Sequence, residues 1–166
     1  MSKVLIRNAT LDDVKEIMAL AEKSWWPAYG ELLPHDQITF MLEKIYSREA
    51  LSRAISTCSQ QFILLEDDGV GWGFAAYSQK ERESDVYKLH KLYINPESHG
   101  KGYGQQLVHE VVSRLKSNGL HVLDLNVYRH NKARAFYEKL GFKIIAEEKI
   151  PLGPYILDDY IMRLEF

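Results

Sequence analysis

The chain has 166 residues, of which 46% are hydrophobic and 27% are charged, and its formal net charge is −2. This length fits one domain with a substantial core, and the small net charge gives no reason to expect a nucleic-acid or membrane partner. The only cysteine, Cys58, excludes an intrachain disulfide, and no apolar run approaches the ~20 residues that span a bilayer. We therefore expect a single soluble domain, residues 1–166, in the cytoplasm.

The first third of the chain predicts a short strand followed by helices. Thr10 and Asp13 have the spacing of a capping box, and apolar residues then repeat with helical period to about Lys23. Residues 25–30, which include Pro27, are expected to interrupt that helix. The predicted elements are a strand over residues 4–7 and helices over about 14–23, 38–45 and 47–55.

The rest of the chain predicts strands interleaved with two helices. Residues 86–94 alternate, so that His90 and Leu92 are expected on the same face of a strand. The further strands are expected over residues 61–66, 71–77, 121–127, 142–146 and 160–164, and the helices over about 107–115 and 133–140. This order predicts an α/β (α+β) fold with a mixed, mostly antiparallel sheet of about seven strands and helices on both faces.

A glycine-rich segment, residues 99–104, lies between a predicted strand and a predicted helix. Its three glycines remove side chains where the backbone could curl around an anion, and a helix N-terminus favours a phosphate. Lys101 adds a positive charge. A plain glycine-rich turn is the alternative, and the spacing alone does not decide between the two.

Other phosphate and metal motifs fit the chain less well. The dinucleotide fingerprint requires a glycine where Gln105 stands, although Asp124 supplies the acidic residue that lies about 20 positions further on. Because Asp124 falls inside a predicted strand, a dinucleotide site is the weaker alternative. No Walker motif occurs, and no two histidines have the spacing His-x-His or His-x-x-x-His, so no metal site is expected.

Two motifs at a characteristic separation resemble those of the GNAT superfamily of N-acetyltransferases. Residues 92–96 followed by 99–104 resemble its cofactor motif, Gln/Arg-x-x-Gly-x-Gly/Ala, and residues 131–142 resemble its second signature. The first strand is similar too, so the resemblance spans essentially the whole chain. The tail, residues 153–162, resembles the polyamine acetyltransferases of the bacterial PaiA type.

The resemblance implies an acetyl-CoA-dependent enzyme that acetylates a primary amine of a small molecule, such as a polyamine, by direct attack in a ternary complex. It also implies a splayed cleft between strands 86–94 and 121–127, where main-chain groups pair with the pantetheine arm and polarise the thioester. The cofactor contacts then expected are Leu92, Tyr93, Ile94, His99, Gly100, Lys101, Gly102, Tyr103, Gly104, Gln105, His130 and Asn131.

Two of these contacts depart from the family pattern. His99 stands where the family has Gln or Arg, so that contact is altered or passes to the main chain. His130 stands where the family usually has Asn, and Asn131 is one residue later. Either residue could contact the pantetheine arm, and Asn131 could instead cap the following helix.

The resemblance also assigns catalytic roles. Tyr137 matches the general acid that protonates the thiolate, although its helical spacing alone would make it a core aromatic. His90 lies at or near the position of a Glu in related chains and, titrating near neutrality, could accept the amine proton. A structural histidine and a water chain are the alternatives.

The acceptor side of the family corresponds here to Trp25, Trp26 and Tyr29, which suit a cationic amine, although at least one Trp is expected simply to pack onto the sheet. Glu31, Asp158 and Asp159 could add negative charge. The family often forms homodimers, so a dimer is a further expectation. The alternative functions are a protein or peptide N-acetyltransferase and a non-catalytic acyl-CoA-binding module.

Overall fold

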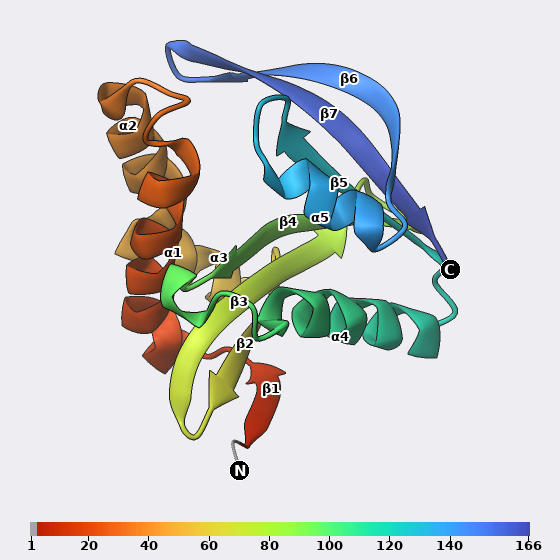
Figure 1. Cartoon of the computed structure of the whole chain (residues 1–166). Helices are drawn as coiled ribbons and strands as arrows, with labels where there is room; N and C mark the ends of the chain where they lie inside the picture. The colour runs from red at the N-terminus through yellow and green to blue at the C-terminus, as the bar shows by residue number, and fades with distance from the viewer. Residues whose placement is uncertain (1–2) are drawn as a thin grey trace.

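A seven-stranded sheet lies between two layers of helices in the computed structural model, which describes residues 3–166 (Figure 1). The strands are β1 (Val4–Asn8), β2 (Gln61–Asp67), β3 (Val70–Gln79), β4 (Val86–Ile94), β5 (Val122–Tyr128), β6 (Lys143–Leu152) and β7 (Tyr155–Glu165). The helices are α1 (Val14–Tyr29), α2 (His35–Tyr46), α3 (Arg48–Ser56), α4 (Tyr103–Ser117) and α5 (Ala133–Lys139). The strand order is β1-β2-β3-β4-β5-β7-β6, and every pair except β4–β5 is antiparallel, so the predicted fold class is confirmed.

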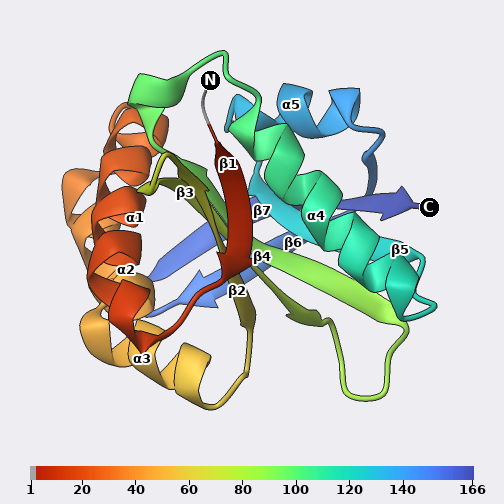
Figure 2. The ribbon, with the colours of Figure 1, turned by 90° about the horizontal axis from the view of Figure 1, so that it is seen from below.

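Each face of the sheet has its own core. Helices α1, α2 and α3 cover one face, and α4 and α5 cover the other (Figure 2). In β2, Leu64 points into the first core while Ile63 and Leu65 point into the second, and all three are fully buried. This covering on both sides explains why β2 is a continuous apolar run. Within residues 3–166, none of the helices has the length and apolar character needed to cross a membrane.

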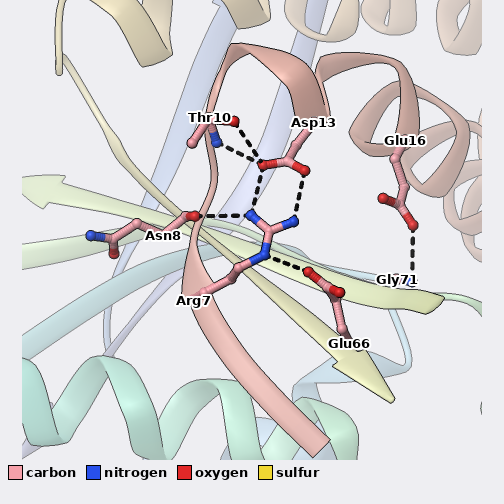
Figure 3. A network of polar contacts seen from close by, with 7 residues as sticks. All are labelled: Arg7, Asn8, Thr10, Asp13, Glu16, Glu66 and Gly71. Atoms are coloured by element: carbon pink, nitrogen blue, oxygen red, sulfur yellow. Dashed lines mark hydrogen bonds and ion pairs between the residues drawn. The ribbon is translucent and has the colours of Figure 1, made fainter. Parts of the chain in front are cut away.

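A polar network fixes the start of α1 to the sheet (Figure 3). The Arg7 guanidinium makes two hydrogen bonds of 2.9 Å to the Asp13 carboxylate, which also accepts from the Thr10 N–H at 2.7 Å. Arg7 thereby lowers the pKa of Asp13. Glu16 of α1 accepts from the Gly71 N–H at 2.9 Å. The predicted capping-box spacing therefore serves both to begin the helix and to attach it to the strands.

The predicted end of the first helix near Lys23 is wrong, because α1 continues through Pro27 to Tyr29. A proline inside a helix removes one backbone hydrogen bond and costs about 3 kcal/mol. Packing offsets this cost, since Trp25 is only 3% exposed. The Ser24 hydroxyl also donates to the Ile94 carbonyl at 3.0 Å, which holds this part of α1 on the end of β4.

The hairpin of β6 and β7 is much longer than the two short strands predicted for it. It arches from the sheet toward α2 (Figure 1). At its tip, Gly153 has φ +58° and lies so close to α2 that a Cβ there would stand 2.3 Å from Cζ of Phe40. Nearly all of β6 is exposed at the edge of the sheet, so it lacks the apolar alternation that would have revealed its length.

A bulge at His90 interrupts β4 and changes which side chains share a face. Leu89 pairs with Tyr77 and Lys91 pairs with Ala76, which leaves His90 without a partner in β3. Leu89 and Leu92 therefore both pack on the α4 side, whereas Lys91 lies over Phe62 on the α1 side. The predicted common face for His90 and Leu92 is wrong, because one extra residue reverses the alternation.

Candidate active site

The cleft opens where β4 and β5 separate. Their parallel pairing runs only from Val86↔Val122 to Leu89↔Leu125, so the later residues of both strands diverge. A pocket of about 220 Å³ lies at this splay and is bordered by α1, α2, β4, β5 and β7. Its aromatic walls are Trp25, Tyr29, Tyr46, Tyr93 and Tyr128. Its ionisable groups other than tyrosines are Lys88, His90, Lys91 and Asp159.

The end of β4 offers a free edge to this cleft. Leu92, Tyr93 and Ile94 pair with β3 on one side, and the pairing with β5 ends before them. Main-chain groups on the open side can thus bond an extended ligand as an added strand would. This free edge is compatible with the predicted contacts of these three residues with the pantetheine arm, which stay a prediction.

The glycine-rich segment has the geometry of an anion cradle. Gly100 and Gly102 have φ of +84° and +75°, and a Cβ at either would meet no atom within 4 Å. Helix α4 begins immediately afterwards, and within residues 3–166 the N–H groups of Gly102, Tyr103, Gly104 and Gln105 have no hydrogen-bond acceptor. Such unpaired donors at a helix N-terminus favour a pyrophosphate. The segment therefore fits the cofactor that the sequence predicts.

The remaining residues of this segment have different surroundings. Gly104 is small for packing, since a Cβ there would lie 3.2 Å from the Phe136 ring. The Tyr103 side chain is buried and donates to Asp67, so only its main chain faces the loop. The side chains of His99, Lys101 and Gln105 are exposed. They are free to reach a bound phosphate.

Tyr137 projects from α5 with its ring against Phe136 and Phe142, at centroid distances of 5.3 and 5.7 Å. Its hydroxyl has no hydrogen-bond partner within residues 3–166. Burial, and then the neighbouring Tyr29, raise the pKa of Tyr137 well above its ordinary value. The phenol therefore stays protonated at neutral pH and can donate, as a general acid must.

Asn131 and His130 occupy different places. The Asn131 carbonyl oxygen accepts from the Ala133 N–H at 2.9 Å, and its amide donates to the Tyr29 hydroxyl at 3.0 Å. Asn131 thus satisfies the first N–H of α5 from the residue before the N-cap, Lys132, and holds an aromatic wall of the pocket. His130 is exposed, with its ring 5.5 Å from that of Tyr128.

His90 lies in the pocket in a neutral form. Its Nε2 is 2.7 Å from the Ser78 hydroxyl. Burial, Lys88 and Lys91 lower the pKa of His90 to about 4. The expectation that His90 titrates near neutrality is therefore wrong for this structure, because desolvation and two adjacent cations disfavour the imidazolium.

Not all of the predicted acceptor-side residues meet in the pocket. Trp25 and Tyr29 line it, whereas the Trp26 ring packs edge-on against His35 at 5.3 Å. Sequence reasoning missed Lys88 and Lys91 as pocket residues. Simple alternation along β4 would place Lys88 and Lys91 on opposite faces of the sheet. The bulge at His90 puts both on the pocket side.

The weaker alternative, a dinucleotide site, requires an acidic residue that is free to bind a ribose, and Asp124 is not free. The Asp124 carboxylate is 1% exposed and bonds Arg163 at 2.7 Å and Lys80 at 2.5 Å. It is therefore held in the sheet by two cations and is not free to bind a ribose.

Comparisons with known proteins agree with this geometry. A family model described as an acetyltransferase (GNAT) domain matches residues 31–153. The chain is 24% identical over 152 residues to the uncharacterized N-acetyltransferase YuaI of Bacillus subtilis, covering 90% of this chain and 86% of that protein. It is 26% identical over 141 residues to the spermidine N(1)-acetyltransferase of Thermoplasma acidophilum, covering 84% of this chain and 88% of that protein.

A solved structure extends the likeness to the whole chain. The PaiA N-acetyltransferase of Thermoplasma acidophilum, in complex with coenzyme A, matches with a TM-score of 0.85 and 25% identity over 99% of both chains. The chain belongs to the GNAT acetyltransferase family and is an acetyl-CoA-dependent N-acetyltransferase.

Proposed function

We propose that the protein transfers the acetyl group of acetyl-CoA to a primary amine of a small molecule by direct attack within a ternary complex. The observation that carries this proposal is that the free edge of β4 and the pocket share Tyr93. An amine in the pocket would thus lie beside the strand that holds the thioester. The single cysteine, Cys58, is exposed and is not among the residues that line the pocket, so no acyl-cysteine step is needed.

The residues of this chain would divide the work as follows. Bound acetyl-CoA supplies the activated acetyl group as a thioester. The N–H groups at the start of α4 hold the pyrophosphate, and the edge of Leu92–Ile94 orients the arm and polarises the carbonyl. Tyr137 donates its proton to the departing sulfur. His90 and Asp159 face the pocket as acceptors for the amine proton, and His90 is the base that the sequence predicts.

A polyamine is the acceptor that the relatives of this chain suggest. It is supported by the spermidine acetyltransferase and the PaiA enzyme that this chain resembles. The aromatic walls, Trp25 and Tyr29, suit a cationic chain through cation–π contacts. We further propose a cytoplasmic enzyme, which fits a chain with one cysteine.

The test is thiol release from acetyl-CoA with a panel of polyamines, aminoglycosides, amino acids and peptides. We expect saturable release with at least one small amine, and initial-rate lines that intersect as both substrates vary, as direct transfer requires. Parallel lines would contradict direct attack. Release with peptides alone would favour the protein-directed alternative, and coenzyme A binding without release would favour a non-catalytic module.

A further inference from the structure

The pocket contains two buried charges of opposite sign that do not neutralise each other. Lys91 is 8% exposed, and its ammonium donates to the Gln60 side-chain carbonyl at 2.6 Å. Asp159 is 5% exposed, and its carboxylate accepts from the Asn126 amide at 3.3 Å. Within residues 3–166, neither group has an oppositely charged partner within 4.0 Å. Buried charges are costly unless they are paired, so both groups are open to a charged ligand.

The two charges come from different strands and have different neighbours. The Lys91 ammonium lies 5.9 Å from the Tyr46 ring centroid and 5.4 Å from that of Phe62, on the side of α2 and β2. Asp159 is in β7, with β5 between it and β4. Two regular strand spacings would separate the backbones of β4 and β7 by about 10 Å, and the divergence of β4 and β5 beyond Leu89↔Leu125 adds to this separation.

Asp159 offers a negative charge that can hold a cationic amine. It faces Tyr128 across the strand pair and adds to the raised pKa of Tyr29, about 12, of which burial is the main cause. Tyr29 and Tyr46 both neighbour Tyr137, which is the proposed general acid. Lys91 has different surroundings from Asp159, since its ammonium lies beside Gln60, Tyr46 and Phe62.

The charges around Lys91 are unfavourable for a second cation of the acceptor. Burial, and then Lys88, lower the pKa of Lys91 to about 8, so the ammonium form predominates at neutral pH. Lys88 also lines the pocket and acts on both Lys91 and Asp159, and the neighbouring His90 is neutral. A linear polyamine with one amine at Asp159 would place its other cation against Lys91, and like charges in contact are strongly disfavoured.

We propose that the acceptor is a dipolar molecule, a primary amine whose far end carries a carboxylate, with the amine at Asp159 and the carboxylate at Lys91. Trp25 and Tyr46 also line the pocket, and their rings suit an apolar chain joining the two groups. This inference rests on the proposed acetylation of a primary amine, and within that function it favours ω-amino acids over the polyamines that the relatives suggest.

Three acceptors with the same five-carbon chain test the inference: 5-aminopentanoate, pentylamine and 1,5-diaminopentane. They differ only in the group at the end of the chain opposite the reacting amine, which is anionic, neutral or cationic. We expect kcat/KM to fall in that order, with about tenfold or more between the first and the last. Lys91→Met should bring 5-aminopentanoate down to the level of pentylamine, and Lys91→Arg should keep the preference. Lys116→Met, at an exposed position on α4, is the control.

A preference of the parent enzyme for 1,5-diaminopentane would overturn the inference without any variant having to fold. An unchanged preference in Lys91→Met, with coenzyme A binding intact, would also overturn it. Thiol release with no amine of either panel, despite coenzyme A binding, would instead overturn the proposed function and this inference with it.

Discussion

At the residue scale, Tyr137 is the side chain whose chemistry is most easily isolated. Its hydroxyl bonds no other group within residues 3–166, so removing it leaves the surrounding packing intact. We predict that Tyr137→Phe lowers kcat about 10²-fold while the affinity for coenzyme A is unchanged. Steady-state thiol release and a binding titration measure the two quantities. A variant with nearly parental kcat would show that another group protonates the thiolate.

His90 gives a prediction about pH. Because its pKa is lowered to about 4, the imidazole is neutral throughout the range from pH 6 to 9. The ratio of the His90→Gln rate to the parent rate should therefore be constant over that range. A ratio that changes through pH 6 to 7 would mean that His90 titrates at its ordinary value in the working enzyme.

The same shift predicts how stability varies with pH. The pKa of His90 is lower in the folded chain than its ordinary value of 6.5, so the unfolded chain binds this proton first as the pH falls. The parent should lose stability relative to His90→Gln between pH 6.5 and 4, and the difference should be constant above pH 6.5. Thermal unfolding of both proteins measures this, and parallel curves across the interval would contradict it.

At the scale of the elements, the loop before α4 can be tested with a matched pair of glycines. Gly102 and Gly119 both have φ +75°, and a Cβ at either meets nothing within 4 Å. Alanine at each position should cost about 1 kcal/mol of stability, from the left-handed backbone alone. Only Gly102→Ala should also weaken coenzyme A binding, by about fivefold or more, as measured by calorimetry. Equal coenzyme A affinities would remove the loop from the cofactor site.

The β6–β7 hairpin is expected to control access to the acceptor pocket, which Leu157 of β7 lines. Gly153→Ala would clash with Phe40 and push the tip away from α2. We predict a several-fold higher KM for the amine with unchanged coenzyme A affinity, and recovery in the double variant with Phe40→Ala. An unchanged KM in the single variant would show that the hairpin tip does not affect acceptor binding.

Sequence patterns predicted those elements whose signals are local. Ser47 caps α3 by accepting from the Ala50 N–H at 3.1 Å, and Gly141, with φ +103°, follows the end of α5. The continuation of α1 through Pro27 was not predictable from a local signal, because it depends on the packing of Trp25 in the core. The full length of β6 was equally hidden, since its partner is β7 and both of its faces are exposed.

At the scale of the whole molecule, the cofactor side and the acceptor side differ in how they are assembled. The cofactor side is built from consecutive residues of β4 and the loop after it, so its motif is visible in the sequence. The acceptor side brings together Trp25, Tyr46, Lys91 and Asp159 from four separate elements. Only the splay of β4 and β5, and the bulge at His90, determine that these side chains meet.

That the protein forms a homodimer stays a prediction.

A crystal structure with coenzyme A bound tests the central claim most directly, because it locates both ends of the cofactor at once. We predict the pyrophosphate on the N–H groups at the start of α4 and the pantetheine arm along the edge of Leu92–Ile94. The sulfur should lie within about 3.5 Å of the Tyr137 hydroxyl, at the mouth of the pocket. A pyrophosphate held elsewhere, or a sulfur far from Tyr137, would contradict this account of the active site.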